Sequence, residues 1–275
     1  TIFFLGKKFE KKKISKNIIY VTLKPFLSSK ILRPLGVDAD STDLFPVNFK
    51  LFFILRNFDI IHSTDQLFSM ARTAKYASRF WKIPLTTSLH TDTPSYSGYY
   101  IKKIFKKFPK FLGIIFINKL KLDILITKKQ RINIQKYIVH CKKAMINDEL
   151  SFDQFNFPKD LKKKITRLSR GVDKNVFKKI NINEIKLRKE YGISKDQKVI
   201  FFCGRIHELK GVILLSKIHK ILKKKIDVVS LLAGQNIHGK ECLKLGGNKI
   251  KLIGYKSQRE LSLLYNFCDL FVFPS

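Results

Sequence analysis

The stretch that decides the fold is VIFFCGRIHELKG, residues 199–211. Its first five residues form an apolar run rich in β-branched and aromatic side chains, which predicts a buried strand. The strand ends at Gly204, two cations follow at Arg205 and Lys210, and an apolar helical pattern begins after Gly211. This arrangement suits a phosphate group, because the glycine lets the backbone approach and the cations and the helix N-terminus neutralise negative charge. The alternative is an ordinary strand–turn–helix with two solvated cations.

On both sides of this stretch, strand and helix patterns alternate, which predicts parallel strands joined by crossover helices. In the second half we expect strands at 199–203, 228–233, 250–253 and 269–273, with helices at 212–222 and 257–267 and a small helix at 182–191 in the linker. In the first half we expect strands at 1–5, 17–23, 58–62, 83–89, 143–146 and 165–169, with helices at 49–55, 70–81 and 130–142. The charged run 7–16 reads as a solvated turn, and residues 150–164 as a helix and loop. The prediction is an α/β chain of two doubly wound units, a first domain at 1–172, a linker at 173–197 and a second domain at 198–275.

Ligands of such sheets lie at the carboxyl ends of the strands. The residues that the sequence places at those ends are His62, His90, Arg170, Gly204, Gly234, Gly254 and Pro274.

The chain is strongly basic, with 55 Lys and Arg against 21 Asp and Glu among 275 residues, a formal charge of +34. Such a charge fits nucleic-acid binding, an anionic membrane surface, or no partner at all. Lysine, isoleucine, phenylalanine and asparagine are abundant while alanine and glycine are scarce, a bias typical of an AT-rich coding genome, and we assign roughly half of the excess charge to it. The lysines are spread over nearly every segment, which makes nucleic acid an unlikely partner.

Residues 99–126 combine five closely spaced lysines with many apolar side chains. This pattern predicts either a membrane-surface helix or a packed helix with a solvated lysine face, and the second reading is favoured. No run reaches 18 apolar residues, so no spanning helix is predicted. Four distant cysteines fit neither a metal pair nor a disulfide framework and predict buried thiols in a reducing cytoplasm. They are Cys141, Cys203, Cys242 and Cys268.

Four landmarks in the second half follow one another in register. They are GRIHELKG (204–211), LLAG (231–234), KLIGY (251–255) and LSLLYNFCDLFVFPS (261–275). This half resembles the donor-binding domain of glycosyltransferase family 4 enzymes, which have a GT-B fold of two Rossmann-like domains facing a cleft. FDIIHST (58–64), IPLTTSLHTDTPSY (83–96) and LSRGVDKNVF (168–177) resemble their counterparts in the first half.

The resemblance implies a set of site residues. Arg205 and Lys210, in the turn between Gly204 and Gly211, would bind the donor diphosphate. The turn at Gly254 and Tyr255 would contact the nucleotide base, and His90 would lie near the donor phosphate and the reacting sugar in a catalytic role. Candidates for the cleft or the acceptor are His62, Asp92, Tyr96 and Asp173.

The implied activity is transfer of a hexose from a nucleotide sugar to an acceptor hydroxyl with retention of configuration. The resemblance implies no metal and no cofactor besides the nucleotide-sugar substrate. The segment SLHTDTPSY (88–96) is most similar to the corresponding segment of family members that glycosylate lipids, so the predicted acceptor is a membrane lipid or a glycan. The predicted place is the cytoplasm, at the inner face of the membrane. The alternative is a basic nucleic-acid-binding or membrane-surface protein without catalysis.

The sequence departs from the family pattern at both ends. Family members begin with a strand and a glycine-rich loop before the position of Thr1, and continue beyond Ser275 with two glutamates eight residues apart. We therefore expect a fragment cut at both ends, which would bind diphosphate weakly and could be inactive.

Overall fold

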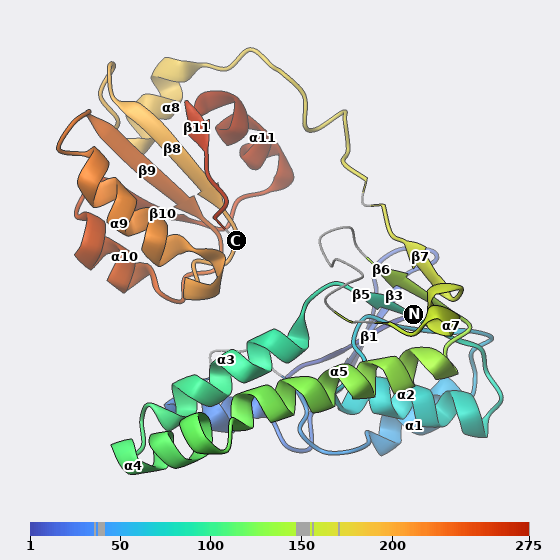
Figure 1. The fold of residues 1–275 in the computed structure, drawn as a ribbon. Helices are drawn as coiled ribbons and strands as arrows, with labels where there is room; N and C mark the ends of the chain where they lie inside the picture. The colour runs from blue at the N-terminus through green and yellow to red at the C-terminus, as the bar shows by residue number, and fades with distance from the viewer. Residues whose placement is uncertain (36, 38–41, 147–154, 156, 170, 275) are drawn as a thin grey trace. The chain divides into compact units, whose positions relative to one another are not determined.

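The computed structural model describes residues 1–35, 37, 42–146, 155, 157–169 and 171–274. The chain forms two compact units, Thr1–Arg170 and Gly171–Ser275 (Figure 1). Each unit has its own four-stranded parallel sheet and its own apolar core. Across the described residues, no helix combines the length and the apolar character that crossing a membrane requires.

The second unit is a doubly wound parallel sheet. Its strands lie in the order β10 (Ile250–Gly254), β9 (Val228–Ala233), β8 (Lys198–Cys203) and β11 (Leu270–Phe271). Helices α8 (Glu184–Tyr191) and α11 (Gln258–Phe267) cover one face, and α9 (Val212–Leu222) and α10 (Gly239–Gly246) cover the other (Figure 1).

Strand β8 is buried on both faces, as its uninterrupted apolar run predicts. Val199 and Phe201 belong to the core that includes Leu264 of α11, whereas Ile200 and Phe202 belong to the core that includes Val212 of α9. Successive side chains of a strand point to opposite faces, so a run without polar alternation satisfies two layers of helices at once. The doubly wound α/β prediction is therefore confirmed for this unit.

One segment of this unit differs from the sequence prediction. The loop expected between β9 and β10 contains helix α10, whose Cys242 is fully buried. This helix has only eight residues and glycines at both ends, so its periodic signal was too weak. The small helix predicted at 182–191 is present as α8, and its Leu187 joins Ile193 in the core of the unit.

The first unit contains two sheets. The first has the order β1 (Ile2–Leu5), β3 (Ile19–Leu23), β2 (Glu10–Lys13). The second is parallel, in the order β4 (Ile61–Ser63), β5 (Leu85–Leu89), β6 (Lys143–Ile146), β7 (Ile165–Arg167). One core joins them through buried residues of both sheets and of helices α1 (Phe49–Leu55), α2 (Ser69–Phe80) and α5 (Leu122–His140). The short elements η1 (Ser29–Leu35) and α7 (Lys159–Lys162) complete the unit.

The prediction of a solvated turn at residues 7–16 is wrong. Residues 10–13 form strand β2, which pairs antiparallel with β3 although all four of its side chains are exposed. Backbone pairing needs no apolar side chain, and a lysine-rich edge strand discourages further strands from adding to it. Charge alone therefore did not distinguish a turn from an edge strand.

The single amphipathic segment predicted at 99–126 is a broken helical hairpin. Helix α3 (Thr93–Phe105) is followed by α4 (Lys110–Gly113), the π-helix η2 (Ile114–Lys119) and then α5. Pro109 separates the first two, because it lacks a backbone N–H and disfavours helical geometry in the residue before it. Of the helix and loop predicted at 150–164, residues 150–154 and 156 lie outside the described residues.

All four cysteines are free thiols, as predicted. Burial raises the pKa of each, that of Cys141 to about 12, so they remain protonated at neutral pH.

A buried histidine makes the second unit sensitive to pH. His219 of α9 is fully buried, and its Nδ1 lies 2.8 Å from the Ser230 hydroxyl of β9. Desolvation, helped by the charges of Lys223 and Lys249, lowers the pKa of His219. Below pH 6.5 the unfolded chain therefore binds a proton at this position more readily than the folded chain does.

We expect the free energy of unfolding to fall as the pH falls from 7.5 to 5.5. The variant His219→Gln, which keeps a polar partner for Ser230 but does not titrate, should lose less stability over the same range. Urea titrations followed by circular dichroism at the two pH values measure both slopes. Equal slopes in the two proteins would show that His219 does not carry this pH dependence.

Candidate functional site

The carboxyl ends of β8, β9 and β10 meet at three glycines. The Gly204 N–H donates to Ala233 O at 2.9 Å, and the Gly234 N–H donates to Gly254 O at 2.8 Å. A Cβ atom on Gly234 would lie only 2.1 Å from Gly204 O, and the φ angle of Gly234 is +127°. Only glycine fits this contact, so the loops that leave β8 and β9 emerge side by side.

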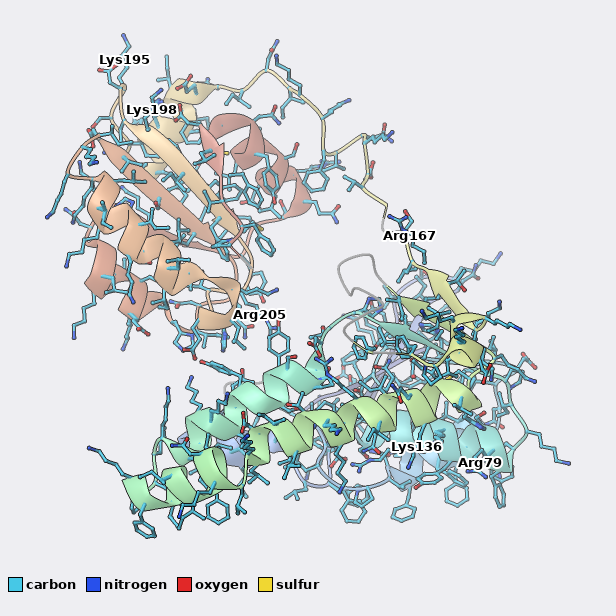
Figure 2. All side chains as sticks on the ribbon, in the orientation of Figure 1. Arg79, Lys136, Arg167, Lys195, Lys198 and Arg205 are labelled. Atoms are coloured by element: carbon cyan, nitrogen blue, oxygen red, sulfur yellow. The ribbon has the colours of Figure 1, made fainter. Side chains whose placement is uncertain are left out.

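The loop after β8 is held by its own backbone. Ile206 is fully buried, its N–H donates to Gln235 O at 2.8 Å, and its carbonyl accepts from His238 N at 2.8 Å. Because Ile206 anchors the loop, the backbone of Arg205 is fixed two residues beyond the end of β8. Figure 2 shows Arg205 at this edge of the second unit.

Lys210 ends a short 3₁₀-helix, η3 (Glu208–Lys210), and Gly211 turns the chain into α9 with a φ angle of +73°. A Cβ atom on Gly211 would lie 2.7 Å from Pro274, so the segment after β11 packs against this turn. The Lys210 Nζ atom lies 5.5 Å from the centre of the Phe273 ring. The structure thus brings the predicted residues Gly204, Arg205, Lys210 and Gly211 together on one connection of about eight residues.

Two histidines and a glutamate flank the cations. Potential ligand atoms of His207, Glu208 and His238 lie within 4.8 Å of one another, close enough to share a metal ion. However, His207 Nδ1 accepts from the Leu209 N–H at 3.1 Å and His238 Nδ1 accepts from the Glu208 N–H at 3.4 Å. A metal on either Nε2 would move the ring proton to Nδ1 and break that bond. The cluster therefore fits hydrogen-bond donation from Nε2 better than metal binding, and the expectation of no metal stays a prediction.

The predicted base-contacting residues follow β10. Gly254 has a φ angle of +69°, and no atom lies within 4 Å of where its Cβ would be. Tyr255 comes next and is 78% exposed, so its ring is accessible to a ligand.

In the first unit, His62 and His90 share one hydroxyl group. On β5, Thr86 and Ser88 point to the face opposite the apolar core, and the register sets His62 of β4 beside Thr86. His62 Nδ1 lies 2.9 Å from Thr86 Oγ1, and its Nε2 lies 2.9 Å from Ser88 Oγ. The same Ser88 oxygen lies 2.7 Å from His90 Nε2. Since Ser88 has a single proton to donate, the tautomers of the two rings are linked.

Desolvation lowers the pKa of His62, and the charge of His90 lowers it further. The two rings therefore disfavour simultaneous protonation.

Asp92 and Tyr96 lie at the start of α3. Asp92 is the N-cap of the helix and forms an ion pair of 3.5 Å with Arg131 of α5. Tyr96 lies in the first turn, half-buried. Asp92 thus has a structural role in addition to the one predicted for it.

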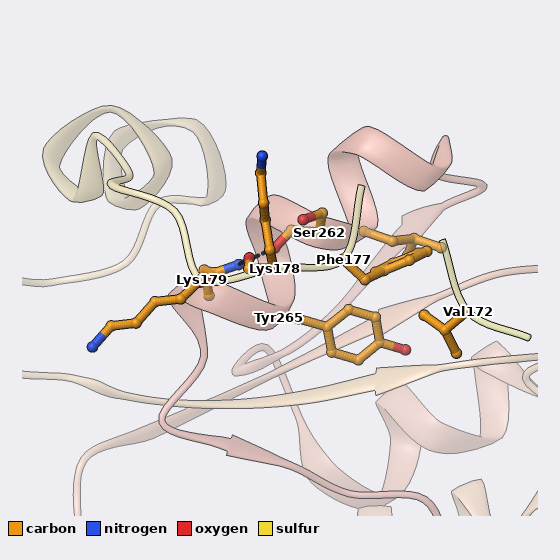
Figure 3. Close-up of a pocket in the computed structure, with 8 residues that line it drawn as sticks. Val172, Phe177, Lys178, Lys179, Ser262 and Tyr265 are labelled. Atoms are coloured by element: carbon orange, nitrogen blue, oxygen red, sulfur yellow. Dashed lines mark hydrogen bonds between the residues drawn. The ribbon is translucent and has the colours of Figure 1, made fainter. Parts of the chain in front are cut away.

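Asp173 belongs to the second unit, where its carboxylate accepts from the Asn175 N–H at 2.9 Å and shapes a turn. The segment after it runs along α11, with Ser262 Oγ donating to Val176 O at 2.6 Å. A groove of about 630 Å³ lies here, between Val172, Phe177 and Tyr265 (Figure 3). Its lining is mainly apolar, and Asp173 is not part of it. The predicted strand-end residue Arg170 lies outside the described residues.

Residues 183–275 match the family of glycosyl transferases group 1. This range contains the three glycines at the strand ends, Gly204, Gly234 and Gly254, and the cations Arg205 and Lys210. No curated protein matches the chain in sequence. The assignment to family 4 within the glycosyltransferases stays a prediction.

Solved structures with a GT-B fold are similar to the chain over nearly all of its length. HepE of Anabaena, solved with UDP and glucose, is 18% identical with a TM-score of 0.57, over 93% of this chain and 60% of HepE. A glycosyltransferase of Rickettsia africae is 17% identical with a TM-score of 0.52, over 93% and 60% of the two chains. A trehalose-6-phosphate synthase is 12% identical with a TM-score of 0.53, over 98% and 71%. The fold is therefore of the GT-B type, and the chain spans about three fifths of the length of the first two proteins.

Sequence reasoning missed three residues around these sites. Ser88 links the two histidines, and no alternation indicates it, because Thr87 next to it is also polar. His238, on the loop after β9, accepts from the Glu208 N–H of the loop after β8, and only its position after Gly234 could have indicated it. Arg131 pairs with Asp92 across 39 residues, and no local pattern indicates such a pair.

The contact between Gly234 and Gly204 in the second unit should tolerate no side chain. Gly234→Ala would set a Cβ against Gly204 O, so we expect a loss of about 3 kcal/mol or more in unfolding free energy. Gly171→Ala, where no atom lies within 4 Å, is the matched control and should change stability by less than about 0.5 kcal/mol. Urea denaturation measures both, and a wild-type midpoint for Gly234→Ala would contradict the close contact.

The charge of His90 should be visible in the titration of His62. In His90→Gln the pKa of His62 should rise toward its usual value but stay below it, because desolvation remains. Histidine ring signals in NMR spectra recorded between pH 5 and 8 report this pKa. His140→Gln removes a histidine elsewhere and should leave the His62 titration unchanged. An unchanged pKa in His90→Gln would show that the rings are not coupled.

Proposed function

We propose that this chain is part of a glycosyltransferase that moves a sugar from a nucleotide-sugar donor to an acceptor hydroxyl. The observation that carries the proposal is the connection from β8 to α9, which lies in the matched range and holds Arg205 and Lys210 at the carboxyl end of a parallel sheet. Structures of HepE with UDP and with UDP-glucose support a uridine nucleotide as the probe to use first.

In this proposal the two cations bind the donor diphosphate. As the bond between the sugar carbon and the phosphate oxygen breaks, negative charge develops on the leaving diphosphate, and Arg205 and Lys210 stabilise it. The Nε2 atom of His238 lies 3.6 Å from the Glu208 carboxylate and His207 is buried, so the proposal assigns this task to the two cations alone. The acceptor oxygen forms the new bond to the sugar, and its proton passes to the leaving phosphate.

The finer predictions belong to the same proposal. For the reaction, they are retention of configuration, membership of family 4 and a lipid or glycan acceptor, with no metal or cofactor required. For the residues, they are a catalytic role for His90, base contacts at Gly254 and Tyr255, and acceptor contacts at His62, Asp92, Tyr96 and Asp173. The proposed location is the cytoplasmic face of the membrane. The resemblance to family 4 supports the first two of these predictions, and the SLHTDTPSY stretch supports the lipid or glycan acceptor.

The donor-binding role can be tested with UDP and isothermal titration calorimetry. Each charge-assisted contact to a phosphate contributes about 1.5–3 kcal/mol, so Arg205→Ala with Lys210→Ala should weaken UDP binding about 100-fold or more. Lys217→Ala with Lys220→Ala removes the same charge from the exposed face of α9 and is the matched control. Uridine, which lacks phosphate, should bind equally to all three proteins.

If the double variant bound UDP as tightly as the control, the diphosphate site would be elsewhere. Transfer from UDP-glucose by the full-length protein, with and without EDTA, then tests catalysis and independence of metals separately from binding.

A further inference from the structure

The hairpin of the first unit ends in a tip without buried residues, and Lys107 beside it donates to Pro34 O of η1 at 2.8 Å. Near the sheet, α3 and α5 are held together by close contacts. A Cβ atom on Gly98 would lie 2.6 Å from Thr127 Oγ1, and Lys102 Nζ lies 2.9 Å from the Asp123 carboxylate. Beyond these contacts, neither α4 nor η2 has a buried residue. Figure 1 shows α4 at the end of the hairpin that is farthest from the strands of its own unit.

The tip nevertheless carries large apolar side chains. Seven of them between residues 108 and 125 are at least 40% exposed, namely Phe108, Phe111, Ile114, Ile115, Leu120, Ile124 and Leu125. Single exposed apolar residues are ordinary on a protein surface, but a group of this size on one tip indicates a binding surface. We call these seven residues the apolar tip.

The tip has a defined backbone and a small internal cluster. The rings of Phe105 and Phe116 stack with centres 5.0 Å apart, and Phe108 lies 6.1 Å from Phe105. The Leu120 N–H donates to Ile115 O at 2.9 Å, so the backbone of η2 is hydrogen-bonded internally. A backbone that satisfies its own polar groups can enter an apolar environment at low cost.

Lysines surround the apolar tip almost without acids. Residues 102–129 contain nine lysines and one acidic residue, Asp123. Asp123 is buried and paired with Lys102, which leaves eight lysines and no exposed carboxylate. Each lysine near an anionic bilayer contributes about 1 kcal/mol of attraction at low ionic strength.

We propose that the hairpin tip docks onto the surface of an anionic lipid bilayer. The apolar tip would enter the boundary between headgroups and acyl chains, and the surrounding lysines would bind the lipid phosphates. A second copy of the chain is a poor occupant, because two clusters of eight lysines would face each other. Nucleic acid would match the charge but offers no environment for exposed isoleucine and leucine side chains. The proposal does not depend on sugar transfer.

Co-sedimentation with vesicles tests this. We expect the protein to bind vesicles of phosphatidylcholine with about 30% phosphatidylglycerol, and to bind pure phosphatidylcholine vesicles at least about tenfold less. Phe111→Ser with Ile114→Ser should bind the anionic vesicles about tenfold less than the wild type. Because the tip contains no buried residue, these variants should keep the wild-type circular dichroism spectrum.

Two matched controls separate the tip from the general basic charge. Ile185→Ser removes an 82% exposed isoleucine that also lies beside lysines, and it should bind like the wild type. Lys110→Glu with Lys119→Glu should reduce vesicle binding more than Lys195→Glu with Lys224→Glu, which changes the same charge on the second unit. Equal losses in both charge variants would overturn the proposal, as would wild-type binding by the apolar double variant.

Insertion of the tip can be followed directly. The chain has one tryptophan, Trp81, so the added signal of Phe111→Trp can be obtained by difference. We expect its emission to shift to the blue with anionic vesicles, whereas Ile185→Trp should not shift. No shift for Phe111→Trp would overturn the proposal. If the apolar double variant lost binding to duplex DNA as much as to vesicles, the tip would be a nucleic-acid surface instead.

Discussion

The backbone contact between Gly204 and Gly234 is the constraint on which the second unit's site depends. Because no side chain separates the two strand ends, the loops that follow run side by side, and buried Ile206 can bond to both Gln235 and His238. This pairing fixes where Arg205 leaves the sheet and where His207 and His238 meet. A phosphate-binding role needs positive groups held in place before the ligand arrives, and the backbone does the holding here.

The lysine excess is partly used by the fold itself. Lys251 Nζ donates to Gly192 O at 3.0 Å, and Lys223 Nζ donates to Gly246 O at 2.9 Å. Both carbonyls lie at the ends of helices, where cations complement the helix dipole and satisfy unpaired acceptors. A composition that reflects genome bias can therefore still supply local stabilisation. In contrast, the nine lysines of residues 102–129 have a single acidic neighbour in that segment, the buried Asp123, and this difference distinguishes them among 55 basic residues.

The sequence allowed much of the second unit to be predicted, because its strands are buried on both faces and its loops begin with glycines. It also placed Arg205 and Lys210 correctly on one turn, since both are close in sequence to the strand that positions them. The sequence predictions that failed did so for physical reasons. Strand β2 carries no apolar side chain, the break at Pro109 turned one helix into a hairpin tip, and the sharing of Ser88 between two histidines depends on strand register. Pairs such as Asp92 with Arg131 exist only in three dimensions.

The order of strands in the second sheet has a consequence for synthesis. Strand β8 lies between β9 and β11, and its Phe201 pairs with Phe271, about 70 residues later in the chain. A ribosome adds roughly 5–20 residues per second, so one edge of β8 stays unpaired for roughly 4–14 seconds after β8 itself has been made. Its apolar side chains are those that form the two cores of the finished unit. The strand that organises the fold is thus also the segment most exposed to misassembly while the chain is being made.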